Sequence, residues 1–259
     1  MKKFLALTFA AAVLGLSACS PSSAETGGGS NTPPAKIVEN SPTIEPPQEP
    51  TEKAAVEAYE VTYSGVELYT SSLGKVWSQV IIEITNTGDV PLYLGSASYD
   101  LEDDDGALAA TSTLPSTIPN VILAGEKGYI YEETTLDGIS ADAKLTVIPH
   151  VKPKAAKVEQ IHYPVSDISI KDDTVWSMSF MGRVENNTEE PLKLTSVAII
   201  LYDADEKPIG IMDTLITDDI AVGEKMGFEG KALKFPPSVN ADAVKSYKTI
   251  AYPSMQFQF

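Results

Sequence analysis

The sequence predicts an all-β protein, in which two tandem immunoglobulin-like antiparallel β-sandwiches follow a signal peptide and a disordered linker. Three observations support this prediction. Apolar and polar residues alternate at period two in short runs, one pattern of about 100 residues occurs twice, and the first 53 residues have the composition of a leader and a tether. The runs show no convincing amphipathic helical period.

The signal peptide is expected at residues 1–18. Lys2 and Lys3 precede an apolar run from Phe4 to Leu16, and small residues follow it, which is the order of a secretory signal. At about 13 residues, the run is too short to cross a hydrocarbon core, which requires roughly 20. A permanent transmembrane helix is therefore the weaker interpretation.

Cys19 is the only cysteine in the chain and directly follows Leu16, Ser17 and Ala18. This stretch resembles the lipobox of bacterial lipoproteins. The resemblance implies that the thiol becomes a diacylglyceryl thioether and that the chain is cut just before Cys19. Two acyl chains hold a protein on a membrane stably, whereas one is marginal. The alternative is an ordinary signal peptide with an incidental cysteine, which would leave a free thiol outside the cytoplasm.

Residues 19–53 are predicted to form a disordered tether rich in proline, glycine and serine. Such a composition buries too little apolar area to offset the entropy of ordering the chain. A flexible segment of this length spans roughly 30 Å, which is enough to hold a folded body clear of the lipid headgroups. The expected location is extracytoplasmic, with the protein anchored to the membrane at the bacterial cell surface.

The formal net charge of −17 limits the partners of this chain. Nucleic acids and anionic lipid surfaces bind clustered lysines and arginines, so a nucleic-acid partner is not expected. An acidic surface keeps a secreted protein soluble and also allows cations or cationic polymers as partners. We therefore expect the partners to be the membrane, through the anchor, and an unidentified protein or polymer of the cell envelope.

The body of the chain contains one unit twice, and the corresponding residues keep their order. The matched stretches are Val76-Trp77-Ser78 with Val175-Trp176-Ser177, Asn86 with Asn186, Pro91-Leu92 with Pro191-Leu192, and Gly125-Glu126-Lys127 with Gly223-Glu224-Lys225. Each copy has the length of one compact domain. We therefore predict two domains, at residues 54–153 and 154–259.

In the first copy, one strand is expected around Val80, Ile82 and Ile84. Trp77 lies three residues before Val80, so the two share a face of the strand only if a β-bulge intervenes. We expect such a bulge near Ser78 or Gln79. Without a bulge, Trp77 faces away from the core and indicates a contact surface.

In the second copy, two predicted strands each have one apolar face. These faces comprise Trp176, Met178, Phe180 and Val184 on the first strand, and Val197, Ile199 and Leu201 on the second. Because there is no cysteine pair, we expect apolar packing around Trp176 to hold the sheets together. Asn186-Asn187-Thr188 formally fits a glycosylation acceptor, but a turn is the default interpretation. The closing residues 255–259 are expected to complete a sheet.

The second copy resembles the FxLYD-domain family of bacterial surface proteins over residues 177–231. The residues that match its motif are Ile199 (at the phenylalanine position), Leu201, Tyr202, Asp203, Gly223 and Phe228. Val222 replaces the proline that usually precedes the motif glycine. The first copy is similar to the related immunoglobulin-like domains of Gram-positive lipoproteins, which begin with a Tyr-Glu-Val-Thr-type strand; here this strand is expected from Tyr59 to Thr62. These resemblances imply a fold and a cell-surface setting, and they bring no catalytic residues.

One acidic run is the best candidate for a cation site, and it comprises Asp100, Glu102, Asp103, Asp104 and Asp105. Calcium prefers several oxygen ligands on a bent loop. The run does not fit an EF-hand loop, because Leu101 and Ser112 stand at its first and twelfth positions. A structural turn is the favoured interpretation, since aspartate and glycine are common turn residues. No other cofactor is expected.

No catalytic site is expected. His150 and His162 are the only imidazoles, too few for a zinc site without thiols, and no nucleophile motif is present. The sequence therefore favours a lipid-anchored extracytoplasmic binding or accessory protein over an enzyme. The alternative is a calcium-stabilised adhesion or sensing module at the cell surface. A transporter's solute-binding subunit fits less well, because alternating helices and parallel strands are missing.

Overall fold

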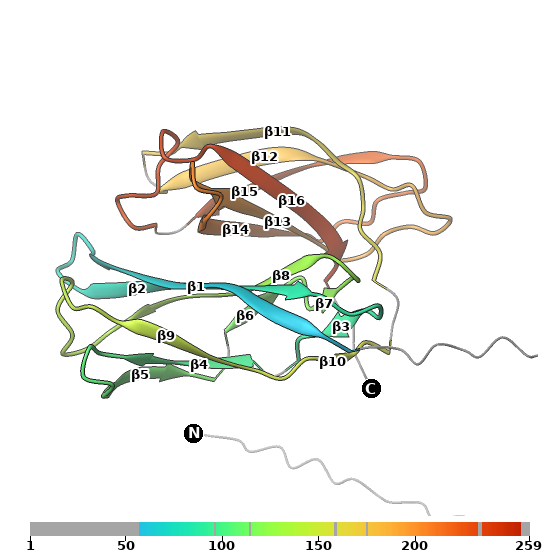
Figure 1. Cartoon of the computed structure of the whole chain (residues 1–259). Helices are drawn as coiled ribbons and strands as arrows, with labels where there is room; N and C mark the ends of the chain where they lie inside the picture. Colours follow the sequence, from blue (N-terminus) through green and yellow to red (C-terminus); the bar gives the residue numbers. More distant parts are fainter. Residues whose placement is uncertain are drawn as a thin grey trace, which may run out of the picture. The chain divides into compact units, whose positions relative to one another are not determined.

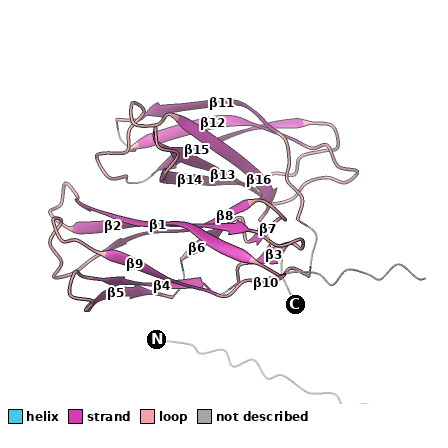
Figure 2. Ribbon diagram, in the orientation of Figure 1, coloured by secondary structure: helices cyan, strands magenta, loops and turns pink. Residues whose placement is uncertain are grey.

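The computed structural model describes residues 57–254, except 96, 114, 158–159, 175 and 233–234. The expected signal peptide, Cys19 with its lipobox-like stretch, the expected tether and the strand expected at 255–259 lie outside the described residues. The chain from Glu52 onward forms one compact unit. Within its described part, all regular structure is β-strand and all strand pairs are antiparallel (Figure 2). The all-β class predicted from the sequence is confirmed.

The first half of the unit, residues 59–155, contains ten strands, listed here in chain order. They are β1 (Tyr59–Thr70), β2 (Val76–Asn86), β3 (Leu92–Tyr93), β4 (Ala97–Glu102), β5 (Leu108–Ser112), β6 (Ser116–Ile118), β7 (Val121–Ile122), β8 (Lys127–Thr135), β9 (Thr146–Val151) and β10 (Lys154–Ala155). They form one sheet in the order β1-β2-β8-β6, a second in the order β5-β4-β9 and a small third in the order β10-β3-β7.

The second half, residues 163–253, contains six strands. They are β11 (Val165–Asp172), β12 (Met178–Glu185), β13 (Thr195–Tyr202), β14 (Pro208–Ile216), β15 (Lys225–Ala232) and β16 (Ser246–Pro253). They form two sheets, in the orders β11-β12-β15 and β14-β13-β16.

Each half has its own hydrophobic cluster between two sheets. In the first half, Val80 and Ile82 of β2 meet Tyr99 and Leu101 of β4. In the second half, the cluster includes Met178, Phe180 and Val184 of β12, Ile199 and Leu201 of β13, and Phe228 of β15. The period-two alternation in β12 and β13 therefore points the predicted apolar faces inward. Fully burying one such side chain contributes about 1.5–3 kcal/mol to stability.

The two halves repeat one buried hydrogen-bonding arrangement at Asn86 and Asn186. Both side chains are fully buried. The Asn86 Nδ2 group donates to the carbonyl oxygens of Val90 (2.8 Å) and Ile122 (3.0 Å). The Asn186 Nδ2 group donates to those of Glu190 and Ile220, both at 2.8 Å. The sequence repeat thus corresponds to a repeated local structure.

A third hydrophobic cluster joins the halves, and the sequence analysis did not anticipate it. The cluster contains Ile81, Ile118 and Tyr129 of the first half, together with Ala198, Ile200, Ile211, Ile250 and Tyr252 of the second. Sheet β1-β2-β8-β6 therefore packs against sheet β14-β13-β16. Strand β13 is buried on both faces, because its odd-numbered residues face one cluster and its even-numbered residues another. Four sheets are stacked as layers, from β5-β4-β9 to β11-β12-β15 (Figure 1).

Two expectations about tryptophans are wrong. No bulge occurs near Ser78 or Gln79, because the pairing of β2 with both neighbours is regular there. Trp77 is half-buried and shares a face of β2 with Ile81, which is the face that contacts the second half. Trp176 lies outside β12, is half-buried and is not part of the core cluster. Phe180 packs there instead, with its ring centroid 6.0 Å from that of Phe228.

Candidate binding site

The acidic run forms a turn between β4 and β5 in which Asp103 is the organising residue. Its Oδ1 atom accepts hydrogen bonds from the backbone N–H groups of Asp105 (3.0 Å) and Ala107 (2.9 Å). Gly106 has a φ of 75°, a left-handed conformation that glycine adopts without strain. The favoured interpretation of this run as a turn therefore has a structural basis.

The matching turn in the second half has the same bonds. The Asp203 Oδ1 atom accepts from the N–H groups of Asp205 and Lys207, both at 2.9 Å. Within the described ranges, no group of three or more His, Cys, Asp or Glu side chains is arranged to hold a metal ion. Asp100 instead pairs with His150, and its Oδ2 atom lies 2.8 Å from the Nε2 atom of His150. This bond lowers the pKa of Asp100, and a bond from Thr111 adds to the effect.

Five of the six residues that match the FxLYD motif lie in the core or in the turns of the second half. Ile199 and Leu201 lie in the core of the second half, and Phe228 packs against Phe180. Gly223 has a φ of 76° in a turn. Its N–H group donates to the carbonyl oxygen of Asn186 at 2.9 Å. Asp203 organises the turn described above.

Tyr202, the remaining motif residue, lies at the interface between the halves. Its hydroxyl group shares a hydrogen bond with that of Tyr129. Burial raises the pKa of Tyr129 far above its ordinary value, and the bond to Tyr202 and the charge of Glu83 raise it further. Burial also raises the pKa of Tyr202. Both hydroxyls are therefore neutral at physiological pH and form a fixed contact between the halves.

An ion pair lies beside these tyrosines. The Nζ atom of Lys127 is 2.8 Å from Oε1 of Glu83, and the Thr62 hydroxyl donates to the same oxygen at 2.8 Å. Burial lowers the pKa of Lys127, but the hydrogen bond and charge of Glu83 outweigh that effect, so the net shift is upward. The Glu83 side chain is only 5% exposed. Lys127 and Thr62 both contact its Oε1 atom, whereas the buried Oε2 atom has no hydrogen-bond partner. The interface thus combines apolar packing with a polar contact of fixed geometry.

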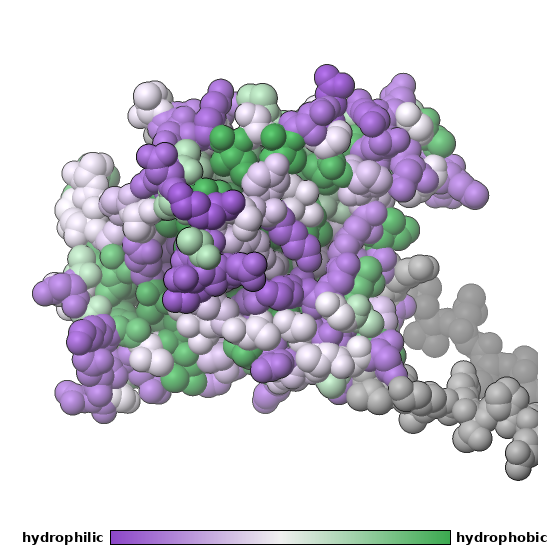
Figure 3. Space-filling view, turned by 45° about the horizontal axis from the view of Figure 1, so that its top comes forward, coloured by the Kyte–Doolittle hydropathy of each residue, from purple (hydrophilic) through white to green (hydrophobic). Residues whose placement is uncertain are grey.

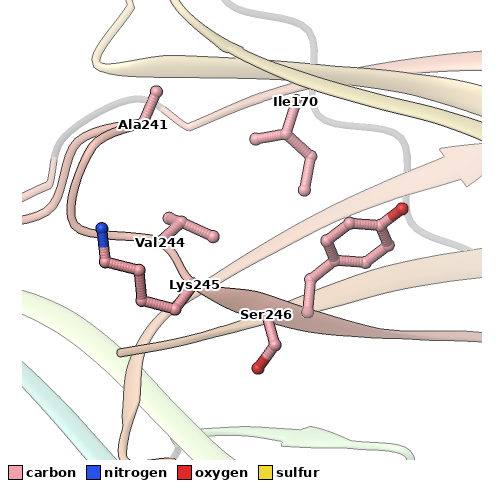
Figure 4. Close-up of a pocket in the computed structure, with 6 residues that line it drawn as sticks. Ile170, Ala241, Val244, Lys245 and Ser246 are labelled. Carbon is pink, nitrogen blue, oxygen red and sulfur yellow. The ribbon is translucent and has the colours of Figure 1, made fainter. Parts of the chain in front are cut away.

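A pocket with a volume of about 470 Å³ opens at the start of β16 and is the best candidate for a ligand site. Its lining residues are Ile170, Ala241, Val244, Lys245, Ser246 and Tyr247. Ile170 and Val244 point into the same opening, and the ammonium group of Lys245 points away from it (Figure 4). Pockets of 300–1,000 Å³ with apolar walls and a few polar groups are typical of ligand sites.

Tyr247 is a core-facing residue that is nevertheless 48% exposed. It shares a face of β16 with Ala251, which lies in the core cluster of the second half. Ile170 and Val244 are partly buried and pack against that same cluster. The pocket is therefore an opening at the edge of the second half, and its apolar walls continue into the hydrophobic core of that half. Its residues belong to no motif, which is why the sequence analysis missed them.

The rest of the visible surface is mostly polar. Hydrophilic residues cover most of the face shown in Figure 3, and apolar residues gather in separate smaller patches. The two histidines lie apart from the pocket lining. His162 is 3.4 Å from Glu126 of the first half, as measured between Nδ1 and Oε2. No helix in the described part of the chain is long and apolar enough to cross a membrane.

No protein-family model matches this chain, and no curated protein shows significant similarity to it.

Proposed function

We propose that this chain is a lipid-anchored extracytoplasmic binding or accessory protein, built from two tandem immunoglobulin-like β-sandwiches with the second of FxLYD type. The observation that carries the proposal is the order of segments along the chain. A lipobox-like stretch ending at Cys19 precedes a segment rich in proline and glycine, and a compact antiparallel β unit follows. This order suits a folded body held at a distance from a membrane.

The packing of the unit supports a role in binding. The buried Tyr129–Tyr202 contact and the apolar cluster around Ile81 and Ile200 fix one half against the other. A fixed pair of sandwiches presents loops and strand edges in a constant arrangement, which reduces the entropy lost when a partner binds. The pocket beside Tyr247 offers an apolar contact of suitable size. The partner in this proposal is a protein or polymer of the cell envelope.

The experiment that tests the proposal replaces the cysteine. A Cys19→Ser variant expressed in a bacterial host should incorporate no labelled fatty acid and should move from the membrane fraction to the soluble extracytoplasmic fraction. A Ser20→Ala variant, which changes the next residue and keeps the thiol, should remain in the membrane fraction. Retention of Cys19→Ser in membranes after a high-salt wash would contradict the anchor.

A further inference from the structure

We propose that residues 255–259 continue β16 as a strand and close a second pocket of the second half with their apolar side chains. This pocket has a volume of about 300 Å³ and is lined by two segments of that half, residues 161–163 and 188–193. The occupant is therefore a segment of the same chain. The proposal goes beyond the binding function above and does not depend on the lipid anchor.

The backbone at the end of β16 leads to this pocket. The Ser254 N–H donates to the carbonyl oxygen of Leu194 at 2.7 Å, and Leu194 directly follows the pocket segment 188–193. On the other side of β16, the Tyr163 N–H donates to the carbonyl oxygen of Ala251 at 2.8 Å. Tyr163 belongs to the other pocket segment, so β16 ends between the two.

The apolar residues of the segment fall on the face of β16 that meets the core of the second half. Ala251 lies in that core cluster, whereas Tyr252 lies in the cluster between the halves. Side chains alternate between the two faces of a strand. In a continued strand, Met255, Phe257 and Phe259 therefore share the face of Ala251 and point toward the core of the second half.

The walls of the pocket match this apolar face. Tyr163 and Leu192 line the pocket and belong to the core cluster of the second half. Ile161 also lines it and is 44% exposed, so part of its apolar surface is available for contact. Met255 or Phe257 in the pocket would cover this surface and extend the core cluster, which is favourable because apolar area leaves water.

The polar face of the segment matches an unsatisfied buried amide. Gln160 is 4% exposed, and neither its Nε2 nor its Oε1 atom has a hydrogen-bond partner within the described residues. Counting along both antiparallel segments from the bridge between Tyr163 and Ala251 places Gln160 opposite Ser254. Gln256 follows two residues later on the same face, at a diagonal position that long side chains reach. Its amide would pair with both unsatisfied atoms of Gln160 and remove the cost of leaving them unpaired.

Both faces of the segment therefore favour the same occupant. Residues 255–259 alternate apolar side chains with uncharged polar ones. The pocket lining also includes the charged residues Glu189, Glu190 and Lys193, and an uncharged segment meets no like charge there. A second copy of the chain carries the same residues, but the chain's own segment is held beside the pocket by the Ser254 hydrogen bond, which gives it a much higher effective concentration.

The decisive test places a photoreactive residue in the segment. The full chain carrying Cys19→Ser, with p-benzoylphenylalanine in place of Phe257, is irradiated, and the cross-linked peptides are identified by mass spectrometry. Cross-links within one chain to residues 161–163 or 188–193 are expected. The same photoreactive residue in place of Gln258, on the opposite face, should give few of them. Cross-links from position 257 only to other parts of the chain, or none at all, would overturn the proposal. So would cross-links between two chains, which would identify a second copy as the occupant.

Thermal unfolding of the same Cys19→Ser chain provides a second measurement. Phe257→Ser should lower the melting temperature by about 4–8 °C, because a large apolar side chain leaves the pocket. Gln258→Ser is the matched control and should change the melting temperature by less than about 2 °C. Equal melting temperatures of the two variants would contradict the proposal.

Gln256→Ala tests the polar face. It should lower the melting temperature of the otherwise native segment, but it should have little effect in a chain that carries Gln160→Ala, because the partner amide is then absent. Equal losses in the presence and absence of Gln160→Ala would show that the two amides do not interact and would overturn the placement of Gln256.

Discussion

Tyr129 of β8 and Tyr202 of β13 join the two halves of the unit through a hydrogen bond between their hydroxyl groups. Tyr129 is fully buried, so its hydroxyl cannot exchange this partner for bulk water. A buried polar group that loses its partner costs about 1–3 kcal/mol. The contact therefore favours one arrangement of the halves over others that leave the hydroxyl unpaired.

The first prediction concerns this pair. Tyr202→Phe should lower the free energy of unfolding by about 1–3 kcal/mol, because it leaves the Tyr129 hydroxyl without its partner. The double variant Tyr129→Phe/Tyr202→Phe should lose less than the sum of the two single variants, as expected for interacting residues. Urea unfolding followed by tyrosine fluorescence and circular dichroism measures these differences. Strict additivity would show that the two hydroxyls do not interact.

This contact also shows what the sequence could predict and what it could not. Period-two alternation correctly placed Val197, Ile199 and Leu201 on one buried face of β13. It could not reveal that Ile200, on the opposite face, is also buried. Which residues cover an outer face depends on how the halves pack, and no local pattern contains that information. The incorrect bulge at Trp77 has the same origin, because that face of β2 contacts the second half.

The repeat was the most informative pattern in the sequence. It matched Asn86 with Asn186, and the structure gives them equivalent hydrogen bonds. In contrast, the pocket beside Tyr247 could not be predicted. It exists because two strand edges lie near each other without pairing, and such proximity follows only from the sheet topology.

The second prediction concerns Asn186. Its buried side chain donates to two backbone carbonyl oxygens and accepts from the Thr188 N–H at 2.9 Å. Asn186→Ala should therefore lower the free energy of unfolding by about 2–4 kcal/mol, because it removes these three hydrogen bonds and leaves the buried Ile220 carbonyl oxygen without this donor. Asn187→Ala, at the exposed neighbouring position, should change it by less than about 0.5 kcal/mol. Equal effects of the two variants in urea unfolding would contradict this account.

The burial of Asn186 also bears on the possible glycosylation acceptor at that position. Its amide nitrogen is fully buried in the folded unit and engaged in two hydrogen bonds. Attachment of a sugar would require this turn to open. The folded chain should therefore not be modified at Asn186, and intact-mass measurement checks this directly.

The third prediction concerns the turn at Asp103. Asp103→Ala removes the acceptor for two backbone N–H groups and should destabilise the unit by about 0.5–1.5 kcal/mol. Asp103→Asn retains a side-chain oxygen and should lose less. Since the carboxylate already has these partners, millimolar Ca²⁺ should leave the melting temperature of the native chain unchanged. A rise in melting temperature that Asp103→Ala abolishes would instead support a calcium site.

The fourth prediction concerns the pH dependence of stability. Burial lowers the pKa of His162 below its ordinary value of 6.5, and nearby Lys248 acts in the same direction, while Glu126 opposes the shift. Below about pH 6.5, the unfolded chain therefore binds a proton at this residue more readily than the folded chain does. Stability from this residue is fully present above that pH and is lost as the pH falls toward the lowered folded pKa.

The His162→Gln variant isolates this contribution from those of the carboxylates. The native chain should lose more stability than His162→Gln between pH 7.5 and pH 5.5, as measured by the urea midpoint. His150→Gln serves as a control, because His150 is exposed and pairs with Asp100 away from the interface. Equal pH dependence of the native and His162→Gln chains would show that His162 titrates alike in the folded and unfolded states. Because His162 lies opposite Glu126 of the first half, the expected loss would fall on the contact between the halves.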